Sequence, residues 1–154
     1  MGRKRYVKDF LKPDWKYNSK RIAKFINYLM QGGRKTLAQQ ILYGALDIAE
    51  DRIGKSGKKI FDKAIDNASP SVEIRSKRVG GATYQVPVQV DDERRFSIAA
   101  KWMVEAAREE KGRPTKETLA DIFTQTSNNK GPIVRKKQEM HQMAEANKAF
   151  AHFA

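Results

Sequence analysis

Cysteine is absent from this sequence of 154 residues. Neither a disulfide framework nor a thiolate metal site is therefore possible, and the composition fits a reducing compartment. Long apolar runs are also missing: no stretch of about 18 apolar residues occurs, and no run of signal-peptide length follows the charged start at residues 1–5. We therefore expect a soluble, cytoplasmic protein that does not enter a membrane.

Acidic residues are scarce relative to basic ones. The chain has 31 Lys and Arg against 18 Asp and Glu, a net charge of +13, and such a surface favours a polyanionic partner, with nucleic acid first. Residues 1–35 alone contain 11 basic and two acidic residues. A solvated face is the ordinary explanation of a charge run, but an excess this concentrated favours a binding segment near the N-terminus.

The residues that could carry catalysis do not converge. The Gly54-Lys55-Ser56 segment resembles the end of a phosphate-binding P-loop, but Ala49 occupies the position of the earlier glycine and the segment leaves a helix, so we interpret it as a helix-to-helix turn. Residues 91–93 are acidic, which fits a helix start better than a nuclease metal site without a second acidic cluster. His141 and His152 are too far apart for one metal ion and are interpreted as surface residues. We predict no enzyme, no metal and no cofactor.

Apolar residues recur with helical spacing in six segments, which predicts a mainly α fold. Ser19, a residue type favoured at helix starts, begins the first segment, and Gly32-Gly33 ends it. The other helices are expected at residues 34–53, between 57 and 69, at 91–112, from Pro114 and from about Val134 to Phe150. Residues 1–18 show no lasting periodicity and predict an extended basic arm, followed by one domain over residues 19–154.

The period changes to that of β-strands at residues 72–90, with a glycine pair in the middle, which predicts a projecting two-stranded antiparallel ribbon. A three-residue loop at 80–82 would place most apolar residues on one face, whereas a two-residue loop would mix the faces, so we predict the three-residue loop. Pro87 cannot donate a ladder hydrogen bond, so its strand should have an unpaired edge. Polar and basic residues gather toward the tip, where they suit an anionic surface: Arg75, Lys77, Arg78, Tyr84 and Gln85.

Basic residues also gather on the predicted helices. Arg94 and Arg95 lie near a helix N-terminus, where the dipole disfavours cations; an anionic partner and internal pairing with neighbouring acids explain them equally well. Trp102 fits a core position better than a stacking platform. One further basic surface is formed by Lys20, Arg21, Lys24, Arg34 and Lys35, another by Lys101 beside Trp102, and a smaller patch by Arg135, Lys136 and Lys137.

Four segments, at residues 24–30, 75–88, 94–102 and 143–152, resemble the S7 family of small-subunit ribosomal proteins, in its bacterial or organellar form. The resemblance covers nearly the whole chain. It implies a structural protein in the head of the small subunit that binds the 3′ major domain of the 16S-type ribosomal RNA and nucleates head assembly. It also implies a ribbon close to transfer RNA and messenger RNA at the exit site, and neighbouring head and platform ribosomal proteins as partners.

The resemblance also implies site residues, by matching position. Those expected to contact ribosomal RNA are Arg3, Lys4, Arg5, Lys8, Lys20, Arg21, Lys24, Arg34, Lys35, Arg75, Lys77, Arg78, Arg94, Arg95 and Lys101. Those expected near transfer RNA and messenger RNA are Lys77, Arg78, Gly80, Gly81, Tyr84 and Gln85. The end at Phe153-Ala154 departs from the longer aromatic and basic tail of many bacterial members, so contacts of such a tail are not carried over.

Two other classes of protein share part of this pattern. Bacterial architectural DNA-binding proteins also combine helices with β-ribbon arms, but Pro87 lies toward the ribbon base and no second copy of the unit is evident. An RNA-processing enzyme would need a convergent acidic or histidine site, which these residues do not form. An RNA-binding structural protein remains the favoured interpretation.

Overall fold

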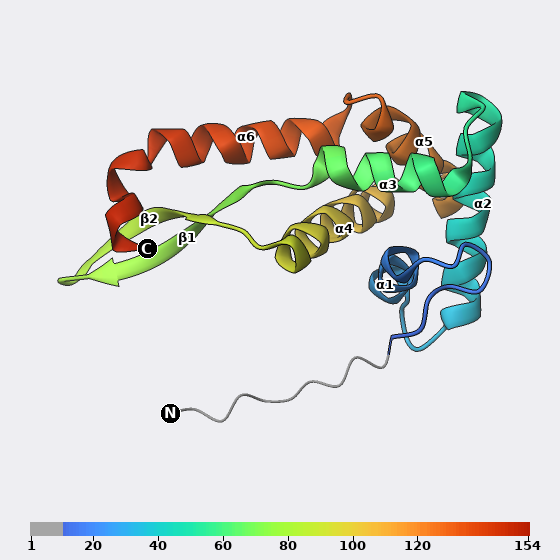
Figure 1. Ribbon diagram of the computed structural model, residues 1–154, viewed down its shortest axis with the longest axis horizontal. Coiled ribbons are helices and arrows are strands. Elements are labelled where there is room, and N and C mark those ends of the chain that lie inside the picture. Colours follow the sequence, from blue (N-terminus) through green and yellow to red (C-terminus); the bar gives the residue numbers. More distant parts are fainter. Residues whose placement is uncertain (1–10) are drawn as a thin grey trace.

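A computed structural model describes residues 11–154 and is mainly helical, as predicted (Figure 1). In chain order the elements are α1 (Lys20–Leu29), α2 (Lys35–Ile53), α3 (Gly57–Ala68), β1 (Val72–Val79), β2 (Ala82–Gln89), α4 (Asp92–Glu109), α5 (Thr115–Ser127), α6 (Pro132–Ala146) and the 3-10 helix η1 (Lys148–Phe153). The ribbon projects from the helical body, and α6 extends outward from the body alongside it. None of the helices in this described part is long and apolar enough to cross a membrane.

Local capping signals set most helix boundaries. The Ser19 hydroxyl accepts a hydrogen bond from the Ile22 amide at 3.3 Å, which confirms the predicted start of α1. The Asp91 carboxylate accepts from the Arg94 amide at 2.8 Å and caps α4, which confirms the helix start predicted at the acidic residues 91–93. Gly54 ends α2 in the left-handed region, with φ of 77°, so the glycine-lysine-serine segment is a turn between helices.

The last two predicted helices begin and end slightly differently. Pro114 is the residue before α5, and Pro132 opens α6 two residues earlier than expected. Phe150 was expected in the same helix, but α6 ends at Ala146 and the chain continues as η1. Six α-helices and one 3-10 helix therefore occur within residues 11–154.

The core lies among α1, α2, α3, α4 and α5, with Ile133 added from the start of α6. Three fully buried phenylalanines, Phe25, Phe61 and Phe123, meet with ring centroids 5.5 to 5.7 Å apart, in tilted and edge-to-face arrangements that favour aromatic pairs. Trp102 is partly buried against this core, which confirms the core interpretation. Leu37, an apolar residue of α2, is in contrast 48% exposed.

The segment before α1 is folded rather than extended. Asp14 is buried, and one of its carboxylate oxygens accepts from the amides of Lys16 and Tyr17 at 3.0 Å each, while the other accepts from the Tyr43 hydroxyl on α2. An aspartate that satisfies the amides two and three residues later stabilises a tight turn. The extended conformation predicted up to residue 18 is therefore wrong for residues 14–18. The basic arm at residues 1–10 lies outside the described residues, and the division at residue 18 stays a prediction.

The ribbon has a different register from the one predicted. Val79 pairs with Ala82 and Val72 with Gln89, so the loop has two residues, Gly80 and Gly81. Both have positive φ, 57° and 83°, which is the geometry of the two-residue turn that matches the twist of paired strands. The prediction of a three-residue loop was wrong. The favourable geometry of the two-glycine turn outweighs the stability that would be gained by gathering the valines on one face. Within the described residues the sheet has two strands, so β2 has the unpaired outer edge that Pro87 predicted.

Candidate nucleic-acid interface

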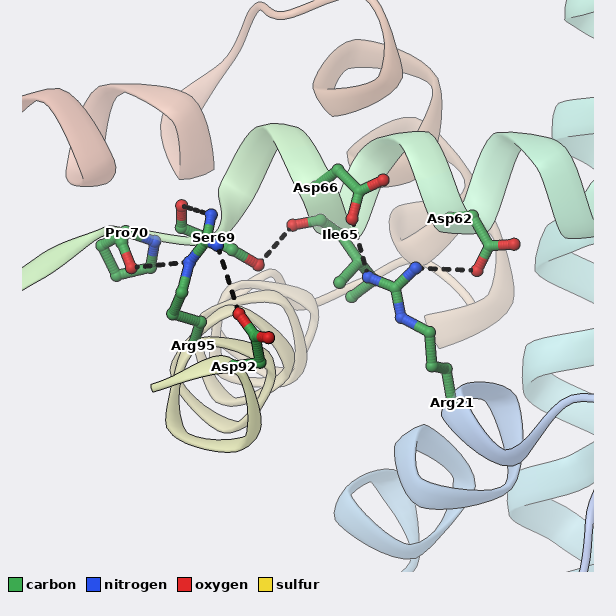
Figure 2. Close-up of polar contacts among 8 residues, drawn as sticks. All are labelled: Arg21, Asp62, Ile65, Asp66, Ser69, Pro70, Asp92 and Arg95. Carbon is green, nitrogen blue, oxygen red and sulfur yellow. Dashed lines mark hydrogen bonds and ion pairs between the residues drawn. The ribbon is translucent and has the colours of Figure 1, made fainter. Parts of the chain in front are cut away.

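A groove of about 400 Å³ lies where α1, α3 and α4 meet. Figure 2 shows two of its arginines, Arg21 from α1 and Arg95 from α4, both reaching toward α3 or the segment that follows it. The groove is lined by Lys20, Arg21, Lys24, Asp66, Ser69, Asp92, Glu93, Arg95 and Phe96. The fold therefore brings together cations that stand about 70 residues apart in the sequence.

Arg21 bridges α1 and α3. Its guanidinium donates to Asp62 at 3.1 Å and to Asp66 at 2.8 Å (Figure 2). It also lies 5.8 Å from the ring centroid of Phe96. The side chain is 40% exposed, so these ion pairs are worth little in stability. Their effect is to hold the guanidinium in one place at the edge of the groove.

Arg95 is held at the opposite edge. It donates to the carbonyls of Pro70 at 3.2 Å and Ser69 at 3.5 Å, and its guanidinium lies 3.6 Å from the carboxylate of Asp92 (Figure 2). Arg94, its neighbour, pairs with Glu73 at 3.3 Å. Both arginines thus have internal partners. Pairing with neighbouring acids was one of the two predicted explanations, and it is confirmed for Arg95, whose partner Asp92 is three residues away. Arg94 pairs instead with a distant acid.

Lys24 and Lys101 extend the basic surface along the α1–α4 contact. The ammonium of Lys24 is 4.0 Å from Glu93, a long and exposed pair, and that of Lys101 lies 5.9 Å from the ring centroid of Tyr28. The Tyr28 hydroxyl donates to Ser97 at 2.9 Å and ties α1 to α4. These two lysines therefore remain available to an anion.

Glu73 anchors the base of the ribbon. It is only 6% exposed and accepts hydrogen bonds from Arg75 on its own strand, at 2.6 and 2.9 Å, and from Arg94 on α4. Burial raises the pKa of Glu73, but the hydrogen bonds and charges of the two arginines outweigh burial and lower that pKa overall. This buried, charged contact joins β1 to α4. The sequence did not predict it, because Arg94 lies 21 residues away.

The two faces of the ribbon are unlike. The ring of Tyr84 packs against Phe150 and Phe153 of η1, with centroids 5.2 and 4.8 Å apart, and Lys77 donates to the Phe153 carbonyl. On the other face Arg78 and Gln85 are exposed. Of the residues expected near transfer RNA and messenger RNA, Tyr84 and Lys77 are thus engaged by the C-terminal turn, whereas Arg78, Gln85 and the glycine turn are exposed, with the Gln85 amide donating to the Ser76 hydroxyl across the strands.

The remaining predicted residues do not join the groove. Arg34 and Lys35 lie at the start of α2. In the patch predicted on α6, Lys137 points inward and donates to the carbonyl of Asn67 at 3.1 Å. Burial, with the charge of Arg95, lowers the pKa of Lys137. Arg3, Lys4, Arg5 and Lys8 lie outside the described residues.

His141 is not the surface residue that was predicted. It is partly buried, and its Nε2 accepts a hydrogen bond from the Ser71 amide at 3.1 Å, which ties α6 to the start of β1. Burial lowers the pKa of His141, as do the charges of Lys137 and Arg95. No group of three or more His, Cys, Asp or Glu that could hold a metal ion occurs among residues 11–154.

One basic surface was missed. A hollow at the α2–α3 turn is lined by Lys55, Lys59 and Lys63 together with Ser127 and Asn128 from the end of α5. The four-residue spacing of Lys59 and Lys63 was a usable signal, because it places these two on one side of a helix, while Lys55 lies in the preceding turn. Without the fold, the polar end of α5 could not be assigned to the same surface.

A helical body, a projecting ribbon and several cationic surfaces together define a protein organised to bind nucleic acid. Residues 1–148 match the family described as ribosomal protein S7p/S5e. The chain therefore belongs to this family of ribosomal proteins, in its bacterial form, and the family is structural rather than enzymatic.

Individual relatives agree over nearly the full length. The small ribosomal subunit protein uS7 of Thermotoga neapolitana is 48% identical over 153 residues, 99% of both chains. The proteins of the same name from Chloroflexus aurantiacus and Thermoanaerobacter pseudethanolicus are each 50% identical over 141 residues, which is 92% of this chain and 90% of the relative.

Proposed function

We propose that this chain is a structural component of the small ribosomal subunit, that it binds the 3′ major domain of the small-subunit ribosomal RNA, and that it starts assembly of the subunit head in the cytoplasmic ribosome. One observation carries the proposal. Cations from α1 and α4 meet around a single groove, and the ribbon is anchored to the same end of α4 through Glu73 and Arg94. RNA could therefore contact the groove and the ribbon together.

Phosphate neutralisation supplies most of the affinity in this proposal, and the shape of a folded RNA junction supplies specificity. Arg21 and Arg95 are held by carboxylates and backbone carbonyls, so they lose little side-chain freedom on binding. Lys24 can exchange its long pair with Glu93 for a phosphate at small cost, because an exposed pair of this kind contributes little.

The ribbon supports the second part of the proposal, an approach to transfer RNA and messenger RNA at the exit site. Arg78 and Gln85 present a polar, exposed face at its distal end. Lys77 and Tyr84 act differently, by binding η1 to the opposite face. Neighbouring head and platform proteins of the subunit are the proposed protein partners.

Binding to the isolated 3′ major domain RNA tests the proposal. Equal-length duplex DNA and an unrelated RNA serve as competitors at physiological salt, with a salt titration for each. We expect clear preference for the ribosomal fragment and a steep fall in affinity as salt rises. Equal affinity for every competitor would contradict the ribosomal assignment, and a flat salt dependence would contradict the phosphate mechanism.

The groove itself is tested by the double variant Lys20→Gln/Lys24→Gln. Loss of two phosphate contacts should weaken binding to the ribosomal fragment roughly tenfold and reduce the salt slope by about 1.5. The control is Lys58→Gln/Lys111→Gln, which removes the same charge from exposed positions that do not line the groove. Equal weakening of both variants would show that only net charge matters.

A further inference from the structure

The hollow at the α2–α3 turn differs from the groove in its charge balance. It encloses about 560 Å³, and its lining contains three lysines and no acidic residue: Ile53, Gly54, Lys55, Ser56, Lys59, Ile60, Lys63, Ser127 and Asn128. The groove, in contrast, includes three acids among its lining residues. The hollow is therefore the more strongly cationic of the two concave surfaces.

The lysines of the hollow form no ion pair within residues 11–154. None of Lys55, Lys59 and Lys63 takes part in an ion pair there, although nearby cations do: Arg52, one turn before Lys55, pairs with Asp121, and Arg21 pairs with two acids of α3. The acids of α3, Asp62 and Asp66, thus pair with Arg21 of α1 and not with the lysines of the hollow.

Concentrating these lysines is unfavourable for the isolated chain. Lys59 and Lys63 are four residues apart on α3, a spacing at which like charges destabilise a helix. Lys55 adds a third positive charge to the same hollow. The Ser56 hydroxyl already accepts from the Lys59 amide at 3.4 Å, so the surface depends on the lysines rather than on the end of the helix. A bound polyanion would offset the repulsion.

We infer that this hollow is a second RNA-binding site, in which Lys55, Lys59 and Lys63 contact the phosphates of an RNA strand other than the one in the groove. The inference rests on the proposed RNA-binding function and adds a second contact to it. The two concave surfaces share no lining residue, because Asp66 of α3 lines the groove whereas Lys59 and Lys63 of α3 line the hollow.

The salt dependence of binding to the 3′ major domain RNA tests the site. The variant Lys55→Gln/Lys59→Gln/Lys63→Gln should lower the salt slope by about 2 and the affinity at physiological salt by roughly tenfold or more. The matched control Lys58→Gln/Lys111→Gln/Lys116→Gln removes the same charge outside the hollow, and Lys58 lies directly beside Lys59 on α3. It should change the affinity less than about threefold.

Identical behaviour of the two triple variants would overturn the site, provided that the parent protein binds. Failure of the parent protein to bind would instead overturn the proposed function. Urea titrations check the fold, and the hollow variant should be at least as stable as the parent, because the substitutions relieve repulsion.

A second measurement leaves every lysine in place. The chain has no cysteine, so a single tether for a hydroxyl-radical source can be placed at Asn128→Cys in the hollow or at Asn27→Cys beside the groove. We expect each tether to cleave the bound RNA, at different segments. Cleavage from residue 27 without cleavage from residue 128, or the same segment cut from both, would contradict a second RNA strand in the hollow.

Discussion

In the helical body, three buried phenylalanine rings from α1, α3 and α5 meet one another, whereas the ribbon buries Val86 and, at its base, a carboxylate held by two arginines. Apolar packing resists local opening because every element shares the same core. The ribbon depends on a few directional contacts: Glu73 at its base and η1 along one face. Body and ribbon should therefore respond to mutation separately.

The largest effect is expected in the body. Phe61→Ala removes a fully buried ring that contacts Phe25 and Phe123, and it should lower the free energy of unfolding by about 3–5 kcal/mol. Chemical denaturation measures this value. Leu37→Ala on exposed α2 surface is the control and should change stability by less than about 1 kcal/mol. Similar losses in both variants would mean that the rings do not dominate the core.

Glu73→Gln should act on the ribbon while leaving the body folded. The substitution keeps the shape but removes charge-assisted hydrogen bonds from Arg75 and Arg94, a loss of about 1.5–3 kcal/mol confined to the ribbon base. Hydrogen exchange of the β1 and β2 amides should accelerate, with α3 and α5 amides unchanged. Glu110→Gln, which breaks an exposed pair with Arg113, is the control. Faster exchange throughout the body would contradict separate support of the ribbon.

Acid should have the same effect as that substitution. Because the folded-state pKa of Glu73 is lowered, its contribution is complete above the unfolded-state pKa and is lost as the pH falls through the folded-state pKa. Ribbon amides of the parent protein should therefore exchange faster, relative to the intrinsic rate, on acidification through this window. In Glu73→Gln the ratio of the measured to the intrinsic exchange rate should stay constant over the same pH range. A pH-dependent ratio in the variant would assign the effect to another carboxylate.

The tip is expected to be less sensitive than the base. Gly80→Val places a β-branched residue at φ of 57° and should destabilise the ribbon by about 1–2 kcal/mol, whereas Gly80→Asn, which tolerates this region, should cost less than about 1 kcal/mol. Cross-strand contacts in nuclear magnetic resonance spectra report the ribbon population. Equal loss in both variants would argue against the two-residue turn.

The smallest expected effect concerns the link from α6 to β1. The Ser71 amide donates to Nε2 of His141, so protonation of that nitrogen must break the bond. The lowered pKa of His141 means that this link is complete above its unfolded-state pKa and is lost as the pH falls through the lowered folded-state pKa. The chemical shift of the Ser71 amide should titrate together with the imidazole. A Ser71 shift that still titrated in His141→Gln would contradict the link.

Helix positions could be predicted from sequence because their signals are local. Ser19 and Asp91 cap the helices they were expected to start, within three residues of the amides they bind. The ribbon could be predicted as an element but not in register, because Gly80-Gly81-Ala82 is compatible with two loop lengths and the valine pattern favoured the wrong one. Only backbone geometry at the two glycines decides between them.

The candidate site was predictable in charge but not in pairing. Lys24, Arg21 and Arg95 were expected to form basic surfaces, and they do line one groove. The pairing of Arg21 with Asp62 and Asp66, 41 and 45 residues later, could not be predicted, because it depends on how α1 packs on α3. Tertiary packing likewise decides which tip residues stay exposed, since Tyr84 is engaged by residues near the end of the chain.

The position of η1 also has a mechanical consequence. Lys77 and Tyr84, which hold η1, are direct partners in the ladder, so the ribbon is supported once at its base and once further along. Beyond that second support only two residue pairs and the glycine turn remain, from Arg78 to Thr83. The ribbon resembles a beam clamped at two points with a short overhang. Bending should be confined to this overhang, so the tip can adjust to a surface while the rest keeps its direction.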